Sequence, residues 1–449
     1  MPEDRNVNRR MLGMHFTPVE VFHEYIMPQI ADRLKDYLWV DMFCGEGNLI
    51  LPMLEYIDPD ERLEFFRKHM MCFDIDGGAV ERSIQNARRY GIPPDIAGEN
   101  IRIRDTLKDY PALDGEYPVF HITNPPYLYL GYIKKQSEAY RHRAYFHGEN
   151  AGYQDLYQIA MMNDLRHGID NMIYIVPSNF LFADAGTRKI REDFLTRYRI
   201  ESCFIFERRI FSFTGTNVMI LGFQRSQSPI DKMEFEAMRV NRHIERKRYV
   251  LYRENNFRPG NEYQDYVRNN FKPDHPVIRF YLTYDEVIKN PGSNRVVLVD
   301  SKDYKHGDYA KETFYVNDDL YDSIRSNPLY VRTVDKGTPE GRSGLYWIAD
   351  DFDADGVFVK GPTYRTSPIQ VFLQPRLTEN ESRALMAIFN RKLNEMREKS
   401  NSDFMTTYKY SDSSAYVRKY LGLKQVREII NTISIDELKG AGAYNGTMP

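Results

Sequence analysis

Short apolar runs alternate with helix-like stretches in the first part of the chain, between residues 36 and 122. The apolar runs predict buried strands, and the amphipathic spacing between them predicts helices. Strand, helix and strand in repeated order is typical of a doubly wound, mostly parallel sheet. The predicted strands are 38–43, 70–74, 101–105 and 119–123, and the predicted helices between them are 48–54 and 78–87.

The alternation continues to about residue 224. The last two predicted strands are joined through Phe211-Ser-Phe-Thr-Gly-Thr, and we expect them to form the antiparallel edge that such sheets often carry. In this stretch the predicted helices are 153–167 and 187–198, and the predicted strands are 172–176, 200–207 and 217–224.

Beyond residue 224 the chain becomes polar and rich in Arg, Asn and Tyr, without a strand–helix rhythm, until helical runs at 379–399 and 416–431. This change predicts an α/β catalytic domain over 1–225 and a C-terminal domain of mixed α+β structure over 226–435. We expect residues 436–449 to form a disordered tail.

Composition restricts the class of protein. The 449 residues are 42% hydrophobic and 28% charged, as in soluble globular proteins, and no apolar run approaches the roughly 20 residues that a membrane helix needs. The start of the chain lacks an apolar signal core, and three cysteines cannot build a disulfide framework. We therefore expect a reduced, cytoplasmic protein without a membrane partner. The net charge of -3 gives no indication of nucleic acid.

A glycine-rich turn, Asp41-Met-Phe-Cys-Gly-Glu-Gly-Asn, follows the first predicted strand. Gly45 and Gly47 allow a positive φ and a close approach of a ligand to the backbone. Ile50 stands where a dinucleotide fingerprint has its third glycine, and no Walker lysine follows, which disfavours NAD and ATP. Asp74 ends the next strand, where a carboxylate can accept both ribose hydroxyls. The alternative is a plain tight turn with a capping carboxylate.

The sequence Asn124-Pro-Pro-Tyr follows the predicted strand 119–123. Two prolines end the strand and leave a stiff loop at the carboxyl edge of the sheet, where ligands bind in such folds. The Asn124 side-chain carbonyl and the Pro125 backbone carbonyl can accept hydrogen bonds from an exocyclic amine. These fixed acceptors make the amine lone pair nucleophilic toward a methylsulfonium without a strong base. An ordinary proline turn is the alternative.

The order and spacing of these motifs resemble the gamma group of amino-methylating DNA methyltransferases, the N6-adenine enzymes of type II restriction–modification systems. The resemblance runs from about residue 11 to residue 224 and implies the fold of S-adenosylmethionine-dependent methyltransferases. The segments that carry it are Phe16-Thr-Pro-Val-Glu-Val, the glycine-rich turn, Asp74, Asp105, Asn124-Pro-Pro-Tyr, Asp155-Leu-Tyr, Ile175-Val-Pro-Ser-Asn-Phe-Leu and Phe211-Ser-Phe-Thr-Gly-Thr-Asn.

The resemblance implies roles for single residues. Asp74 would bind the ribose of S-adenosylmethionine and Asp105 its adenine amino group, although Thr106-Leu107 stands where some relatives have an aromatic residue. Phe211 would stack on a flipped target base opposite Tyr127. Asp155 could equally be a helix N-cap. The implied cofactor-binding residues are Phe16, Thr17, Asp41, Gly45, Gly47, Asp74 and Asp105, and the implied catalytic residues are Asn124, Pro125, Pro126, Tyr127 and Phe211.

Residues 239–279 contain ten basic and five acidic residues, interleaved with aromatic ones. This pattern suits a surface that follows DNA phosphates, and a solvated face is the alternative. In the resembled family, the region after the last catalytic motif recognises the target sequence.

The sequence thus predicts a site-specific DNA methyltransferase that transfers a methyl group from S-adenosylmethionine to N6 of a flipped-out adenine. The implied partners are duplex DNA and a cognate restriction endonuclease, and we expect a monomer. The scattered histidines indicate no metal. A protein-glutamine methyltransferase, an RNA amino-methyltransferase and a catalytically idle DNA-binding subunit remain open alternatives.

Overall fold

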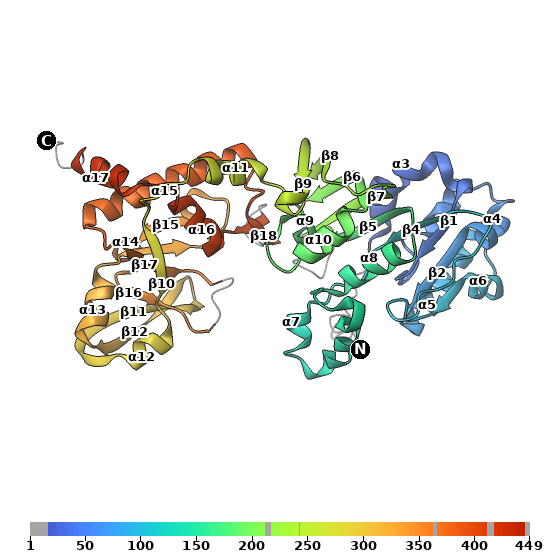
Figure 1. Cartoon of the computed structure of the whole chain (residues 1–449). Coiled ribbons are helices and arrows are strands. Elements are labelled where there is room, and N and C mark those ends of the chain that lie inside the picture. The colour runs from blue at the N-terminus through green and yellow to red at the C-terminus, as the bar shows by residue number, and fades with distance from the viewer. Residues whose placement is uncertain (1–16, 212–216, 242, 362–365, 411–416, 445–449) are drawn as a thin grey trace. The chain divides into compact units, whose positions relative to one another are not determined.

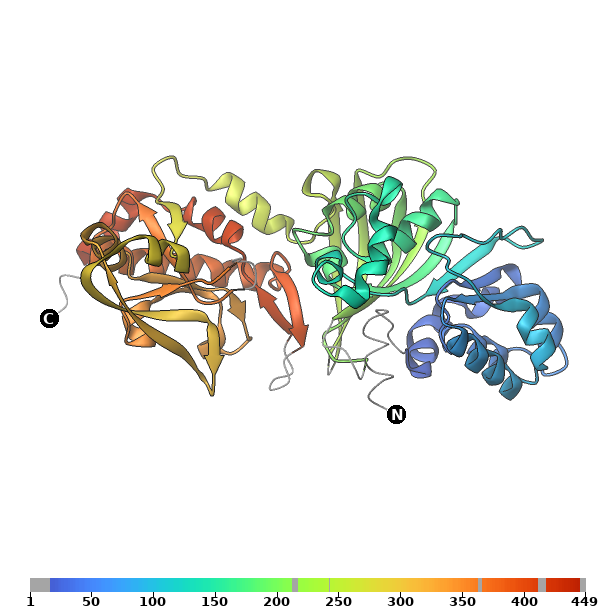
Figure 2. The ribbon, with the colours of Figure 1, turned by 90° about the horizontal axis from the view of Figure 1, so that it is seen from below.

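The computed structural model describes residues 17–211, 217–241, 243–361, 366–410 and 417–444. The chain divides into two compact units, Met1–Pro259 and Gly260–Pro449. Figures 1 and 2 show the elements of each unit in two views.

The first unit is built on a sheet of nine strands among the described residues, in the order β3-β2-β1-β4-β5-β7-β6-β8-β9. The five strands from β3 to β5 in this order are parallel, and β7 is antiparallel to both of its neighbours. This is the predicted doubly wound, mostly parallel sheet. The strands are β1 Leu38–Asp41, β2 Met70–Asp74, β3 Ile101–Ile103, β4 Val119–Thr123, β5 Asn171–Pro177, β6 Tyr198–Phe206, β7 Val218–Arg225, β8 Lys232–Val240 and β9 Ile244–Tyr252.

Both faces of this sheet are covered by helices, as parallel sheets require. Along β5, Met172 and Tyr174 pack in one apolar cluster with α8 and α10, whereas Ile173 and Ile175 pack in the cluster on the opposite face. The main helices of the unit are α4 Arg62–His69, α5 Gly77–Ala87, α6 Pro94–Asn100, α8 Leu156–Arg166 and α10 Arg188–Leu195.

Short helical segments complete the first unit. Three of them, α7, η5 and η6, lie between Asn124 and α8 in the chain. They are α2 Val19–Val21, η1 Phe22–Ile26, α3 Met27–Ile30, η2 Ala31–Asp36, η3 Leu51–Tyr56, η4 Arg88–Tyr90, α7 Leu130–Ile133, η5 Ser137–Phe146, η6 Gly148–Asn150, α9 Asn179–Phe182 and η7 Arg253–Asn255.

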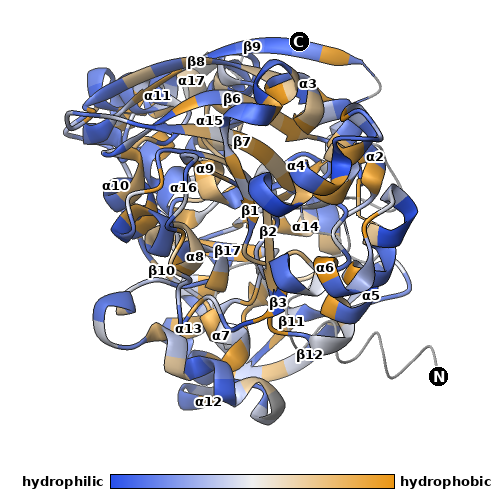
Figure 3. Ribbon diagram, turned by 90° about the vertical axis from the view of Figure 1, so that its right-hand side faces the viewer, coloured by the Kyte–Doolittle hydropathy of each residue, from blue (hydrophilic) through white to orange (hydrophobic). Residues whose placement is uncertain are grey.

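Four predictions about chain organisation were wrong. The boundary at 225 comes too early, because β8 pairs with β6 and β9 pairs with β8, so the sheet continues and the unit ends at Pro259. Strand β9 was missed because much of it is exposed and polar. In Figure 3 it is mostly hydrophilic, whereas β7 is mostly hydrophobic. For the same reason β6 and β7 lie inside the sheet and not at its edge.

The other two corrections concern helices. The stretch 48–54 does not form the predicted α-helix; the only regular element there is the short 3₁₀ segment η3, which carries Pro52 near its start. Most of the predicted disordered tail is helix α17, Ile435–Tyr444, whose Leu438 is fully buried. The remaining residues of that tail, 445–449, lie outside the described residues.

The second unit has the predicted mixed α+β structure. Its described strands form one four-stranded sheet, β10-β17-β13-β15, and two three-stranded sheets, β12-β11-β16 and β14-β19-β18. The long helix α15 begins with a capping box between Thr378 and Glu381, which satisfies backbone N–H groups at its first turn.

The bounds in the second unit are as follows. The helices are α11 Asn261–Asn269, α12 Tyr284–Lys289, α13 Asp318–Arg325, η8 Pro339–Gly341, α14 Ile348–Phe352, α15 Glu379–Ser400, α16 Leu423–Ile430 and α17. The strands are β10 Val277–Tyr281, β11 Pro291–Lys305, β12 Asp308–Val316, β13 Leu329–Arg332, β14 Val334–Asp335, β15 Gly344–Trp347, β16 Gly356–Phe358, β17 Ile369–Gln374, β18 Thr406–Tyr410 and β19 Val417–Tyr420.

Candidate active site

The carboxyl ends of the parallel strands bring several of the predicted site residues to one pocket. Its empty volume, open solvent included, is about 650 Å³. Five predicted residues line it, three from the glycine-rich turn and the ends of β2 and β3, and two from the loop after β4. The lining residues are Phe43, Gly45, Asp74, Ile75, Arg104, Asp105, Thr106, Leu107, Asn124, Pro126, His142, Tyr145 and Leu156.

The glycine-rich turn holds the Asp74 carboxylate in place. The Gly45 N–H donates to Asp74 Oδ2 at 2.8 Å, and the Asp76 N–H donates to Oδ1 at 2.9 Å. Gly45 and Gly47 have φ of +55° and +85°, and a Cβ on Gly47 would lie 2.5 Å from the Leu51 side chain. The turn therefore needs glycine at both positions. Burial raises the pKa of Asp74.

Asp41 ends β1 beneath this turn and is almost fully buried. Its Oδ1 accepts a hydrogen bond from the Thr123 hydroxyl at 2.6 Å and one from the Phe43 N–H at 3.0 Å. Its Oδ2 is buried and has no hydrogen-bond partner among the described residues. Burial raises the pKa of Asp41 to about 6. This acceptor oxygen is thus unsatisfied by the part of the chain that the structure describes.

Asn124 is held by partners on both ends of its amide. Its Nδ2 donates to the Thr17 hydroxyl at 2.9 Å, which joins the start of the described chain to the Asn124 loop. The Tyr127 hydroxyl donates to Asn124 Oδ1 and lies 2.7 Å from the carbonyl oxygen of Ile175. The side chain of Asn124 is 9% exposed, so it is fixed and still reachable from the pocket.

The rest of the loop is anchored to helix α8. Pro125 is buried and Pro126 is half-buried. Asp155 stands at the N-cap position of α8, and its Oδ1 accepts from the Leu128 N–H at 2.8 Å. Burial raises the pKa of Asp155 to about 7. Asp155 thus fixes the end of the loop.

Phe211 and Tyr127 meet in one apolar cluster, since Phe211 belongs to it and Tyr127 packs against it. Phe211 is only 3% exposed, so little of its ring is available for stacking in this structure. Its stacking on a base stays a prediction. Phe16 lies outside the described residues.

Sequence reasoning missed the walls of the pocket. Phe43 and Ile75 each come shortly after a strand-terminal aspartate, and they give the pocket apolar surface together with Leu107. The signal was present, because an apolar residue next to a strand-terminal acid at this edge faces the same cavity. Ile75 is 49% exposed.

Segment η5 closes the far wall of the pocket with His142 and Tyr145. The Tyr145 hydroxyl donates to Asp105 Oδ2 at 2.8 Å, and Lys108 lies 3.8 Å from the same oxygen. Burial raises the pKa of Tyr145, so this hydroxyl keeps its proton. Nothing in the sequence of η5 signalled this role.

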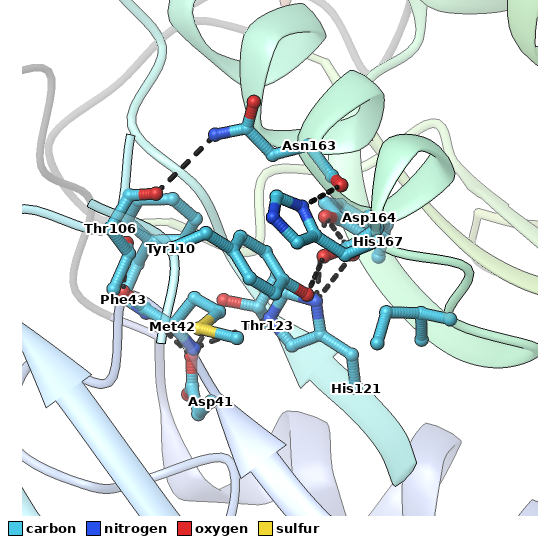
Figure 4. A network of polar contacts seen from close by, with 12 residues as sticks. Asp41, Met42, Phe43, Thr106, Tyr110, His121, Thr123, Asn163, Asp164 and His167 are labelled. Atoms are coloured by element: carbon cyan, nitrogen blue, oxygen red, sulfur yellow. Dashed lines mark hydrogen bonds and ion pairs between the residues drawn. The ribbon is translucent and has the colours of Figure 1, made fainter. Parts of the chain in front are cut away.

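A buried polar network beneath the pocket was also missed (Figure 4). His121 Nδ1 lies 2.5 Å from Asp164 Oδ2, and the hydroxyls of Tyr174 and Tyr110 donate to the same carboxylate at 2.5 Å and 2.8 Å. His121 Nε2 accepts from the Met42 N–H at 3.3 Å. His121 Nδ1 therefore carries the proton. The network ties the end of β1 to β4, β5 and α8.

The same network supports the loop that carries Asp105. The Thr106 hydroxyl donates to the Met42 carbonyl at 3.0 Å, and Asn163 Nδ2 donates to the carbonyls of Thr106 and Leu107 at 3.3 Å and 3.2 Å. Figure 4 shows Asn163 reaching toward Thr106 from helix α8. The floor of the pocket is thus a rigid hydrogen-bonded layer.

Six of the ten basic residues of 239–279 have acidic partners among the described residues, so that phosphate binding by this stretch stays a prediction. Arg246 and Arg248 pair with Glu236 and Glu234 across the β8–β9 ribbon. The stretch also continues past the end of the first unit at Pro259. Further pairs are Arg239 with Glu207, Arg253 with Glu192 and Asp231, Arg258 with Asp184, and Arg268 with Asp265, and the aromatic residues Tyr249, Phe257 and Tyr263 are buried.

Comparison with protein families gives one match. Residues 109–211 match the Eco57I restriction-modification methylase family. The matched segment contains the Asn124 loop and ends at Phe211, and it confirms the resemblance to restriction–modification methyltransferases. No curated protein sequence matches the chain.

The solved structures with a similar fold include restriction–modification proteins. The Type ISP enzyme LlaGI, in complex with a DNA substrate mimic, matches at a TM-score of 0.50 and 12% identity over 85% of this chain and 45% of its own. The EcoKI M protein matches at a TM-score of 0.36 and 15% identity, over 67% of this chain and 63% of its own. A type I methyltransferase subunit from Streptococcus thermophilus matches at a TM-score of 0.33 and 15% identity, over 50% of this chain and 47% of its own. The chain spans less than two thirds of each of these proteins. The predicted methyltransferase fold is confirmed.

Two further observations concern membrane helices and metal binding. No helix among the described residues is long and apolar enough to cross a membrane. Within the same residues, no cluster of three or more His, Cys, Asp or Glu side chains could hold a metal ion.

Proposed function

We propose that this protein is a DNA methyltransferase that uses S-adenosylmethionine to methylate N6 of adenine in duplex DNA, within a restriction–modification system. One observation carries the proposal. Asn124, held by Thr17 and Tyr127, lies at the wall of the pocket that also contains Asp74 and Asp105. An amine acceptor and a nucleoside-binding pocket therefore share one cavity.

The residues of the pocket fit S-adenosylmethionine. Asp74 keeps two carboxylate oxygens at the end of β2, where ribose hydroxyls can donate to them. Phe43, Ile75 and Leu107 supply apolar surface for a flat purine. Asp41 Oδ2, the buried oxygen without a partner, suits the ammonium group of the methionine part. When bound, S-adenosylmethionine supplies an electrophilic methyl group.

Asn124 and Pro125 would activate the target amine. Asn124 Oδ1 accepts from Tyr127 and would also accept from an N–H of the amine, since an amide oxygen can accept two hydrogen bonds. The Pro125 carbonyl would accept from the other N–H, so the nitrogen lone pair turns toward the methyl group. These dipoles are already oriented, because the Asn124 loop is fixed by Tyr127 and Asp155.

Adenine as the target rests on the resemblance of the Asn124 motif to N6-adenine enzymes. A paired adenine cannot bring N6 to this pocket, so the base must leave the helix. We propose that Tyr127 and Phe211 stack on it, which requires the ring of Phe211 to become uncovered. The second unit would recognise the target sequence, with duplex DNA and a cognate endonuclease as partners.

The test is an acceptor comparison. The protein is incubated with S-adenosylmethionine labelled in the methyl group and, separately, with duplex DNA, RNA and protein acceptors. We expect label in duplex DNA only. Label in protein glutamine or in RNA would replace the proposal with one of those enzyme classes, and no transfer to any acceptor would indicate a non-catalytic subunit.

A further inference from the structure

His142 is a buried side chain with unused hydrogen-bonding groups in the wall of the pocket. It comes from segment η5, lines the cavity together with Asp105, and is 6% exposed. Neither Nδ1 nor Nε2 has a hydrogen-bond partner among the described residues. Two polar atoms of one ring are thus buried at the cavity and left unpaired.

Such an arrangement needs an explanation, because buried polar groups in proteins are nearly always hydrogen-bonded. The ring is held by its neighbour, since His142 and Tyr145 stack with centroids 5.9 Å apart and planes 19° apart. Tyr145 is itself fixed by its hydrogen bond to Asp105. The position of the imidazole is thus set by packing, and no described residue takes up either of its nitrogens.

We infer that His142 is a cofactor-binding residue that donates a ring N–H to an acceptor nitrogen on the purine edge of S-adenosylmethionine, next to the amino group. The inference rests on the proposed function. Asp105 accepts from the amino group in that proposal, and the adenine ring has acceptor nitrogens, N1 and N7, on either side of that group. A carboxylate acceptor beside an imidazole donor matches this edge.

The charges around His142 favour a neutral ring. Burial lowers the pKa of His142, and Arg141 and Lys108 lower it further, against the opposing effect of Asp105. A neutral imidazole has one N–H donor and one acceptor nitrogen. The pair formed by Asp105 and His142 would therefore select adenine over guanine, which has an acceptor oxygen in place of the amino group.

Binding of S-adenosylhomocysteine tests the inference without any methyl transfer. Calorimetry would compare the wild type with His142→Ala, His142→Gln and a control, His147→Ala. His147 lies on the same stretch but is exposed and does not line the pocket. We expect about tenfold weaker binding for His142→Ala, the effect of one hydrogen bond in a buried site, and no change for the control.

Deaza analogues separate a hydrogen bond from a packing effect. Wild-type protein should bind one of the two analogues, 1-deaza- or 7-deaza-S-adenosylhomocysteine, about tenfold more weakly than the parent compound. The His142→Ala variant should bind that analogue and the parent compound equally well. Equal binding of all three compounds by the wild type would overturn the inference, even where the variants fail to fold. The inference would also be overturned if His142→Ala weakened the binding of all three compounds by the same factor relative to the wild type. His142 would then only shape the cavity.

The result also separates this inference from the proposed function. Wild-type protein that binds no S-adenosylhomocysteine contradicts the cofactor assignment and the role of His142 with it. Wild-type binding that is unchanged in His142→Ala contradicts the role of His142 alone. The unfolding temperature without ligand, measured for each variant, shows whether the fold is intact.

Discussion

The pocket at the ends of β1, β2 and β4 and the ribbon formed by β8 and β9 differ in how far their polar side chains are satisfied within the protein. At the pocket, Asp41 Oδ2 and both ring nitrogens of His142 have no hydrogen-bond partner among the described residues. On the ribbon, Arg246 and Arg248 pair with glutamates of the neighbouring strand. The charges of the ribbon are therefore satisfied within the protein, whereas these two side chains keep polar atoms that a ligand could satisfy.

The largest expected effect is on turnover, when the side chain of Asn124 in the pocket is removed. We expect Asn124→Ala to lower turnover by about 10²- to 10³-fold, because a fixed acceptor for the target amine is removed. Binding of S-adenosylmethionine should survive. Turnover would be measured with labelled S-adenosylmethionine, and binding by calorimetry.

Asn171→Ala is the matched control, since Asn171 lies at the opposite end of β5 from the pocket. Near-normal turnover of Asn124→Ala, or an equal loss in the control, would contradict the role of Asn124.

A second test concerns the cofactor side of the pocket. We expect Asp74→Asn to weaken binding of S-adenosylmethionine by about 10- to 100-fold, because hydrogen bonds to a charged group contribute about 1.5–3 kcal/mol each. Affinity for DNA should change little. Asp95→Asn, an exposed change on α6, is the control. Calorimetry that gives unchanged cofactor affinity for Asp74→Asn would refute the ribose role.

A third test uses pH. The pKa of Asp41 is raised to about 6, so its carboxylate is protonated below that value. If Oδ2 accepts from the ammonium of the cofactor, the ionised form binds best, and affinity should fall by about tenfold for each pH unit below 6. Asp41→Asn should remove this dependence. A wild-type affinity that stays constant from pH 5 to 8 would contradict the contact.

The raised pKa of Asp41 also affects the stability of the protein without ligand. Ionisation of Asp41 should strengthen cofactor binding but destabilise the ligand-free fold. The folded state binds a proton that the unfolded chain has already released, in the window between the ordinary pKa of aspartate, about 4, and 6. The contribution of Asp41 therefore destabilises the protein progressively as pH rises through this window. Asp41→Asn should raise the unfolding temperature at pH 7, measured without ligand.

The smallest effect is expected on the ribbon. Each guanidinium of Arg246 and Arg248 already has a carboxylate partner at the surface, where such pairs contribute about 0–1 kcal/mol. We expect the double change to Gln to leave the salt dependence of DNA binding nearly unchanged. A slope lower by about 0.9 for each arginine would instead restore these residues as phosphate contacts.

Local patterns predicted the fold of the first unit and much of its pocket. Strands β1, β2 and β4 are short apolar runs, and Asp74 and Asn124 follow from their place at strand ends. Parallel strands bring these ends together whatever the distance along the chain, so sequence order was enough.

Features that depend on partners far apart in sequence could not be predicted. The charge of 239–279 was counted within one window, whereas the carboxylates that neutralise it include Glu207 and Glu192 outside that window. Strand β9 carries Glu245-Arg-Lys-Arg, which resembles a loop until β8 is known to pair with it. His142 depends on η5 folding over the pocket, and no local pattern indicated that.

The central claim is that the pocket and Asn124 together methylate adenine in DNA. The most direct measurement is nucleoside mass spectrometry of duplex DNA after incubation with the wild-type protein and S-adenosylmethionine, with Asn124→Ala in parallel. We expect N6-methyladenine as the only new methylated nucleoside, and none from the variant. A methyl group on cytosine, or equal N6-methyladenine from both proteins, would contradict the account.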